Sequence, residues 1–177
     1  MYIPDLNLFL VNVPKRGTNT LDMAVRSLYG GCLPGHVPVT VARQILGHDF
    51  TAWALIRDPW ERFASAMNFI YGDTDTHLDD AMNGALRHQT IVKKSQAYFV
   101  DEATRLFPFE ALPEVLRLVG YFEEIPHENR SFKRWTTKEI RAHARAGEVA
   151  ERYADDFALR AAVSHGGDNP NNPFGQR

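Results

Sequence analysis

The most constraining feature of this sequence is a short apolar run that passes directly into a loop and then a helix. Residues 8–13 have the length and the apolar character of a buried strand, and they stop at Pro14. Beyond the loop, Leu21, Val25 and Leu28 recur at helical spacing, and two glycines follow. The intervening loop, PKRGTNT, is therefore expected at the carboxyl end of a strand and the positive end of a helix.

The same arrangement is repeated at a second apolar run, FTAWALI at 50–56. This run is followed by Asp58, which is suited to cap a helix, and by Pro59, which is suited to its first position; the predicted helix extends to Tyr71. Two strand–loop–helix units in succession favour parallel strands joined by crossover helices. We therefore expect an α/β chain with a P-loop-like three-layer fold, in which helices flank a small parallel sheet.

The remaining pattern predicts a helix between the two units and a helix-rich second half. In the first of these, Val37, Val41 and Ile45 have the spacing of a single apolar helix face. The further expected elements are helices at 78–86, 95–105 and 113–119, a third strand at 106–109, a helix capped by Thr136, and a last helix carrying Tyr153, Phe157 and Ala161.

The length of 177 residues and the mass of 20.1 kDa are those of one domain, which we place at 1–163. Hydrophobic residues make up 44% of the chain and charged residues 24%, which excludes a wholly disordered chain and a coiled coil. The last segment, 164–177, is rich in Gly, Asn and Pro, and its lack of apolar surface predicts a flexible C-terminal tail.

Charge and cysteine content narrow the classes of partner and compartment. The formal charge of −2 opposes a nucleic-acid-binding role, and the single Cys32 rules out an internal disulfide. No apolar run approaches the roughly 18 residues of a membrane helix, and the N-terminus has neither a basic region nor a cleavage site. We expect a cytoplasmic protein with no membrane span. The sequence does not indicate an oligomeric state.

The loop after the first strand has the residues of an anion site. Backbone N–H groups at a helix start favour anions, Gly17 permits close approach, and Lys15 adds a positive charge. Thr18, Asn19 and Thr20 add side-chain donors. The Walker A pattern G-x-x-x-x-G-K-[ST] is absent. The alternative is an ordinary turn with a surface lysine.

A second anion-binding group follows the second strand. Arg57 would stand at the carboxyl end of that strand, where ligands bind in open α/β sheets, and Ser65 lies two turns into the next helix. Together with the first loop, these residues predict a site for a ligand with two separated anionic groups. In the alternative interpretation, Arg57 pairs with Asp58 or Glu61, and Ser65 is only a small packing residue.

His36 is a candidate general base, because it precedes a predicted helix near the same sheet edge and histidine titrates near neutral pH. A histidine that merely flanks the helix or packs in the core is the alternative, since the chain has 7 histidines.

These segments resemble the sulfotransferases. LFLVNVPKRGTNTL is similar to their 5′-phosphosulfate loop, P-K-x-G-[TG]-[TN]-[ST]-L in the carbohydrate branch, and ALIRDPWERFASA resembles their 3′-phosphate segment, R-[DN]-P-x-x-R-x-x-S-A. GHVPVTVARQILG resembles the histidine-containing segment of the heparan and bacterial carbohydrate sulfotransferases. Together with weaker later matches such as SQAYFVDEA and YADDFAL, the resemblance covers about residues 8 to 160.

The resemblance implies a donor, 3′-phosphoadenosine 5′-phosphosulfate (PAPS), and a role for each matching residue. Lys15 would stabilise the leaving oxygen, and His36 would accept the proton of the attacking hydroxyl. The residues implied in binding the 5′-phosphosulfate are Lys15, Gly17, Thr18, Asn19 and Thr20, with Arg16 as a further contact to the sulfate or the acceptor. Arg57 and Ser65 would bind the 3′-phosphate, and Arg134 would belong to a loop over the nucleotide.

The implied reaction moves a sulfuryl group to a hydroxyl acceptor, with carbohydrate as the expected acceptor class. Like phosphoryl transfer, it depends on positioning and electrostatics, but sulfuryl carries less charge, so we expect no metal. Two alternatives remain. One is a P-loop-like ATP-dependent phosphotransferase. The other is a catalytically silent nucleotide-binding protein, for which the less usual residues Arg16 and Asn19 and the short length of the chain are the only support. Tyr71, His77, Arg87, His88 and Gln96 are candidate acceptor contacts.

Overall fold

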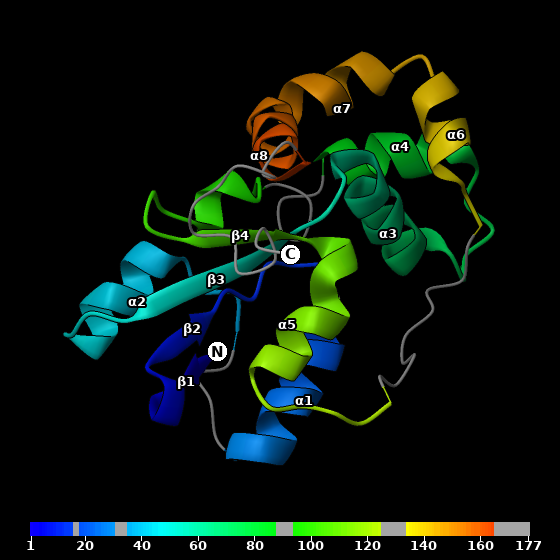
Figure 1. The fold of residues 1–177 in the computed structure, drawn as a ribbon. Helices are drawn as coiled ribbons and strands as arrows, with labels where there is room; N and C mark the ends of the chain where they lie inside the picture. Colours follow the sequence, from blue (N-terminus) through cyan, green and yellow to red (C-terminus); the bar gives the residue numbers. More distant parts are fainter. Residues whose placement is uncertain (16–17, 31–34, 88–93, 125–133, 165–177) are drawn as a thin grey trace.

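The computed structural model describes residues 1–15, 18–30, 35–87, 94–124 and 134–164. In these ranges the chain is an α/β protein with one sheet, flanking helices and a helix-rich C-terminal half (Figure 1). The elements in chain order are β1 (Tyr2–Ile3), η1 (Pro4–Leu6), β2 (Leu8–Leu10), α1 (Thr18–Tyr29), α2 (Val39–Leu46), β3 (Thr51–Ile56), α3 (Pro59–Tyr71), α4 (Leu78–Arg87), η2 (Ala97–Phe99), β4 (Arg105–Pro108), η3 (Phe109–Ala111), α5 (Leu112–Leu118), α6 (Thr137–Ala142), α7 (Ala146–Arg152) and α8 (Ala154–Ser164).

The sheet has four strands in the order β1-β2-β3-β4, and it is mixed rather than purely parallel. β2 pairs with β3 in parallel, with Phe9 opposite Ala52, and β3 pairs with β4 in parallel. The sequence pattern predicted these three parallel strands but missed β1, which runs antiparallel to β2. β1 is only two residues long, and the chain reverses after it through η1 and Asn7, which adopts a left-handed conformation (φ 46°).

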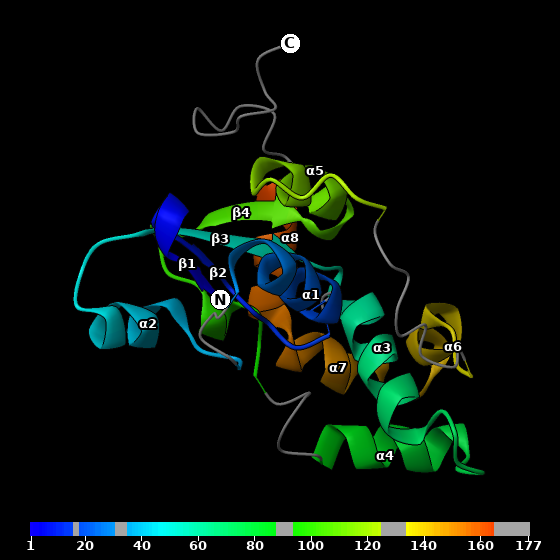
Figure 2. The ribbon, with the colours of Figure 1, turned by 90° about the horizontal axis from the view of Figure 1, so that it is seen from below.

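Alternating side chains of the strands build a core on each face of the sheet. Leu8, Leu10 and Leu55 belong to one cluster, which α1 and α5 complete, whereas Phe9, Ala52 and Ala54 belong to a second cluster completed by α2, η2 and α8. The views in Figures 1 and 2 agree, with α1 and α5 on one side of the sheet and α8 on the other. The sheet is thus the middle layer of three.

A third cluster lies beyond the carboxyl ends of the parallel strands. It joins α3, α4, α6 and α7 through side chains such as Phe63, Met82, Ile140 and Val149. Figures 1 and 2 both show α3, α4 and α6 grouped beyond one end of the sheet. The carboxyl end of the sheet therefore faces a second packed unit, and α3 begins at that boundary.

The predicted helix caps are confirmed. The Asp58 side chain accepts a hydrogen bond from the Glu61 backbone N–H (3.0 Å), and Pro59 is the first residue of α3. At α6, Thr136 and Glu139 form a complete capping box. The Asp58 cap fixes where α3 begins, and so it fixes the position of Arg57 one residue before the cap.

The predicted helix at 95–105 is wrong. This stretch contains only the short η2, because polar side chains bind the backbone in place of helical hydrogen bonds. The Asp101 backbone N–H donates to the Thr104 hydroxyl (3.0 Å), and the Asp156 carboxylate accepts from the backbone of Gln96 and Ala97. The stretch instead runs as an irregular segment from Lys94 into β4.

The predicted buried face of α2 is also wrong, although the helix itself is confirmed. Val41 and Ile45 are exposed, whereas Val39 and Ala42 are completely buried against the sheet. Pro38 occupies the N-cap of α2. Because a small residue such as Ala42 lets a helix approach a sheet closely, the spacing of large apolar residues pointed to the wrong face.

Two further expectations concern the ends and the surroundings of the chain. The predicted tail at 164–177 lies, apart from Ser164, outside the described residues. Within the described ranges, no helix combines the length and the apolar character needed to span a membrane.

Candidate functional site

Lys15 follows β2 at the carboxyl end of the sheet, in a backbone conformation that favours glycine. Its φ is +65°, a left-handed value that costs a non-glycine residue about 1–2 kcal/mol. Its ammonium nitrogen lies 3.9 Å from the centre of the Phe69 ring on α3. Among the described residues, no carboxylate lies within ion-pair distance of Lys15. The strained backbone therefore directs an uncompensated cation toward α3.

The protonation of Lys15 reflects this environment. Burial, and after it the positive charge of Arg57, lower the pKa of Lys15 from 10.5 to about 8. An anion placed between the two cations would offset both effects on the Lys15 pKa, because it would supply a compensating negative charge. A lowered lysine pKa at a strand end is the property expected of an anion site before the anion binds.

Arg57 joins the two strand–loop–helix units. It directly follows β3, and its Nη1 donates to the carbonyl oxygen of Lys15 (3.2 Å). Its Nε is 3.4 Å from a carboxylate oxygen of Glu61, and its guanidinium lies 5.0 Å from the centre of the Phe109 ring. The Glu61 contact is long, and the Glu61 side chain is 48% exposed, so this pairing is weak. Both interpretations of Arg57 thus have support: it pairs loosely with Glu61, and it reaches the Lys15 loop.

His36 is held against the same segment that leads to Lys15. Its Nδ1 lies 2.7 Å from the backbone carbonyl of Asn12, two residues after β2. Because a carbonyl only accepts, Nδ1 must donate, and the lone pair of neutral His36 is then on Nε2. His36 is an exposed residue, and in this tautomer its Nε2 can accept a hydrogen bond.

The side-chain oxygen of Asn12 was missed by the sequence analysis. It is buried and has no hydrogen-bond partner within the described ranges. An unpaired buried acceptor costs about 1–3 kcal/mol and calls for a specific explanation. Asn12 lies between β2 and Lys15, and its backbone carbonyl binds His36. The Asn12 side-chain oxygen is therefore a further candidate to accept a hydrogen bond from a bound ligand.

The other predicted phosphosulfate contacts lie in or next to the first turn of α1. Thr18 and Asn19 are its first two residues, and Thr20 is almost wholly buried. Arg16 and Gly17 lie outside the described residues. α1 therefore begins directly beyond the Lys15 turn, so the positive end of its dipole faces the same region.

Ser65 lies in the middle of α3, and Arg134 lies beside this helix. Ser65 is half-buried and four residues before Phe69, so these two residues share one face of α3. Arg134 donates its backbone N–H to the side-chain oxygen of Asn68 (2.9 Å), next to Phe69 in the sequence. Asn68 also binds both backbone groups of Trp135, which anchors the backbone at Arg134 and Trp135 on α3.

Several candidate acceptor contacts have other surroundings. Tyr71 packs closely on Gly84 of α4, where a β-carbon would lie 2.2 Å from the Tyr71 hydroxyl, and Gln96 is completely buried. His77 and Arg87 are exposed, and His88 lies outside the described residues. Tyr71 and Gln96 therefore belong to the packed framework.

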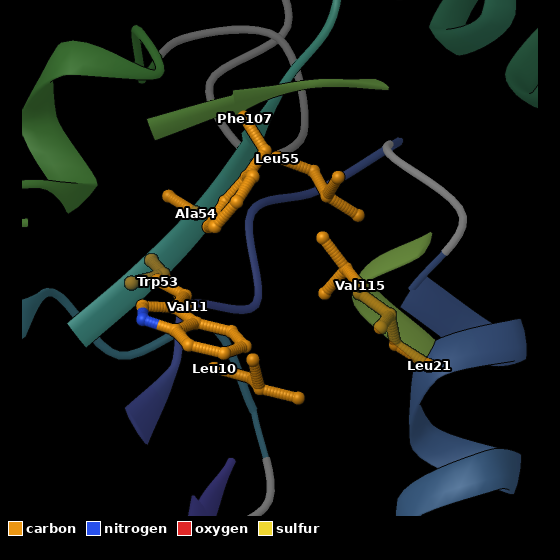
Figure 3. Close-up of a pocket in the computed structure, with 8 residues that line it drawn as sticks. All are labelled: Leu10, Val11, Leu21, Trp53, Ala54, Leu55, Phe107 and Val115. Atoms are coloured by element: carbon orange, nitrogen blue, oxygen red, sulfur yellow. The ribbon is translucent and has the colours of Figure 1, made fainter. Parts of the chain in front are cut away.

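A small apolar pocket lies between the sheet and the helices on one face, and it is separate from these polar groups. Figure 3 shows Leu21 of α1 and Val115 of α5 facing Leu10, Leu55 and Phe107 of the strands. Apart from the indole of Trp53, its lining is aliphatic or phenyl. This pocket is a gap in core packing; its lining has no charged side chain, and its one polar side-chain group is the Trp53 indole N–H.

No group of three or more His, Cys, Asp or Glu residues within the described ranges is arranged to hold a metal ion. Comparison with protein-family models, curated proteins and solved structures finds no match for this chain.

Proposed function

We propose that this chain is a PAPS-dependent sulfotransferase of P-loop-like fold that acts on a hydroxyl acceptor. The observation that carries the proposal is the placement of Lys15 and Arg57. Two cations from successive strand–loop–helix units lie at one sheet edge, and the charge of Arg57 contributes to the low pKa of Lys15. A ligand with two anionic groups would relieve this repulsion.

The residues fit the two ends of such a donor. Lys15 and the start of α1 would hold the 5′-phosphosulfate, together with Arg16, Gly17, Thr18, Asn19 and Thr20 of the same loop. Arg57 and Ser65 would hold the 3′-phosphate. Arg134, anchored on α3 through Asn68, would lie over the nucleotide. The donor supplies an activated sulfuryl group, and the chain supplies charge and orientation.

The chemistry required of the protein is limited to three tasks. His36 Nε2 accepts the proton of the attacking hydroxyl while its Nδ1 stays bound to the Asn12 carbonyl. The bond from sulfur to the bridging oxygen breaks as the bond to the acceptor oxygen forms, and Lys15 neutralises the charge that develops on the leaving oxygen. The products are a sulfated acceptor and adenosine 3′,5′-bisphosphate.

Carbohydrate is the proposed acceptor class. The Phe69 ring is 61% exposed directly beside the Lys15 ammonium, so an apolar surface borders the place where transfer would occur. A sugar presents both hydroxyl groups and an apolar C–H face, and it could use both features of this surface.

Calorimetry with adenosine 3′,5′-bisphosphate, AMP and ATP–magnesium tests the proposal. We expect metal-independent binding of the bisphosphate, much weaker binding of AMP, and PAPS-dependent sulfation of a carbohydrate panel. Preferential binding of ATP–magnesium would favour the phosphotransferase alternative. Bisphosphate binding with no turnover on any acceptor would favour a silent nucleotide-binding protein, and binding of neither nucleotide would refute all three functions.

A further inference from the structure

The main chain of Arg57 is bound by a residue that is distant in sequence and completely buried. The side-chain oxygen of Gln96 accepts from the Arg57 backbone N–H (3.0 Å), and its side-chain nitrogen donates to the Arg57 carbonyl (2.9 Å). This pair of bonds imitates the pairing of a neighbouring strand. It fixes the Arg57 peptide just beyond the end of β3, and so it limits the directions in which the Arg57 side chain can leave.

Gln96 is in turn held by the first turn of α8. One carboxylate oxygen of Asp156 accepts hydrogen bonds from the backbone N–H groups of Gln96 and Ala97. Asp156 is itself completely buried. A buried carboxylate with this many donors is a fixed point, because any displacement leaves charge unpaired in the interior.

The other carboxylate oxygen of Asp156 binds Arg62, which contacts both sides of the site. Arg62 Nη1 is 3.1 Å from Asp156, its Nη2 donates to the Lys94 carbonyl (2.6 Å), and its Nε donates to the Pro14 carbonyl (3.4 Å). Pro14 directly precedes Lys15. One buried guanidinium therefore connects the Lys15 loop, the segment leading to Gln96, and α8.

We infer that Gln96, Asp156 and Arg62 are positioning residues that hold Arg57 and the Lys15 loop in register. The site that Lys15 and Arg57 form for a ligand with two anionic groups is then complete only when α8 is docked. None of the three is required to touch the ligand. Gln96 acts through the Arg57 peptide, and Arg62 acts through Pro14. Asp156 acts through both Gln96 and Arg62. The inference deepens the proposed function and rests on it only for the identity of the nucleotide ligand.

Gln96→Met is the most selective variant, because methionine keeps the volume and apolar stem but cannot make either bond to Arg57. We expect a loss of about three- to tenfold in affinity for adenosine 3′,5′-bisphosphate and little change for AMP. The double variant Gln96→Met, Arg57→Ala should bind no more weakly than Arg57→Ala alone. The control is Gln44→Met on the exposed surface of α2, which should change neither affinity.

A role limited to overall stability gives a different result. It would lower the unfolding temperature, leave the preference for the bisphosphate over AMP intact in the folded fraction, and add to the effect of Arg57→Ala. That outcome overturns the inference. If Gln96→Met fails to fold, Gln96→Leu provides the same comparison, since it also keeps an apolar side chain of similar size and can make neither bond to Arg57.

A second measurement needs no nucleotide, so it separates failure of the inference from failure of the proposed function. The chain has five lysines, and ¹³C-methylation makes the titration of Lys15 observable by NMR. We expect Arg57→Ala to raise the pKa of Lys15, and Gln96→Met to raise it in the same direction, because Arg57 is no longer held against the loop. An unchanged Lys15 pKa in Gln96→Met beside a raised pKa in Arg57→Ala overturns the inference, and an unchanged pKa in both variants overturns its premise that Arg57 is held against the Lys15 loop.

Discussion

The two ends of the parallel strands β2 and β3 both carry a histidine bound to a backbone carbonyl, yet their surroundings differ. At the amino end, the Tyr2 hydroxyl lies 2.8 Å from both Asn7 Oδ1 and His48 Nε2. His48 Nδ1 donates to the Leu46 carbonyl (2.8 Å), and the Asn7 amide donates to the Asp49 carbonyl (3.0 Å). The polar side chains of this cluster are therefore partners of one another, and they tie strand ends and loops together.

At the carboxyl end, polar groups are placed with incomplete partners. Lys15 has a low pKa and, among the described residues, no carboxylate partner; Arg57 has only a long contact to Glu61; and the buried oxygen of Asn12 is unpaired. His36 uses one ring nitrogen on the Asn12 carbonyl, and no contact to its other nitrogen is found within the described ranges. The comparison suggests that the amino end serves stability, whereas the carboxyl end keeps its capacity for a ligand.

The largest effect should follow from removing the cation at the carboxyl end. Lys15→Ala is expected to lower kcat/KM for sulfation by about 10³–10⁵, because it removes a charged donor-binding contact together with stabilisation of the leaving oxygen. Steady-state kinetics with PAPS measures this loss. Lys138→Ala, on the exposed side of α6, is the control and should retain full activity. Substantial activity in Lys15→Ala would remove the main distinction between the two ends.

The two histidines provide a direct test of the comparison. His36→Ala should lower kcat by about 10²–10⁴ and leave the affinity for adenosine 3′,5′-bisphosphate unchanged, because the ring acts on the acceptor proton. His48→Ala should leave kcat unchanged and lower the unfolding temperature, since it breaks the cluster with Tyr2. Kinetics, calorimetry and thermal unfolding of both variants are needed. Equal kinetics in the two variants would contradict the assignment of His36.

Arg57→Ala should separate the two anionic groups of the ligand. We expect the affinity for adenosine 3′,5′-bisphosphate to fall by about 1.5–3 kcal/mol, the usual range for hydrogen bonds to charged groups, and the affinity for AMP to change little. Calorimetry with both nucleotides measures the difference. A parallel loss for the two nucleotides would place Arg57 outside a 3′-phosphate site.

The strand–loop–helix units, their caps and the location of Lys15 and Arg57 could be predicted, because each depends on residues close together in the sequence. Arg62 lies one helical turn before the predicted site residue Ser65, but its partner Asp156 is 94 residues away. Gln96 was expected to face the acceptor, and its burial depends on α8, which local patterns do not place. β1 was missed because two residues provide no periodicity. What could not be predicted is therefore mainly the long-range support of the site.

The smallest expected effect concerns pH and tests the cause of the unusual lysine. The pKa of Lys15 is depressed in the free protein to about 8, and a bound anion would raise it, so binding is accompanied by proton uptake at alkaline pH. The affinity for adenosine 3′,5′-bisphosphate should therefore be nearly constant between about pH 7 and 7.5, where both phosphates are largely ionised, and fall as pH rises through 8, by about tenfold at pH 9. Calorimetry in buffers of different ionisation enthalpy measures both the affinity and the proton uptake.

Lys15→Ala should abolish the dependence of affinity on pH, and Arg57→Ala should move it to higher pH, because one of the two causes of the low Lys15 pKa is gone. Constant affinity of the unmodified protein from pH 7 to 9.5 would mean that the Lys15 charge does not meet the ligand, and that the carboxyl end binds through Arg57 and the α1 backbone alone.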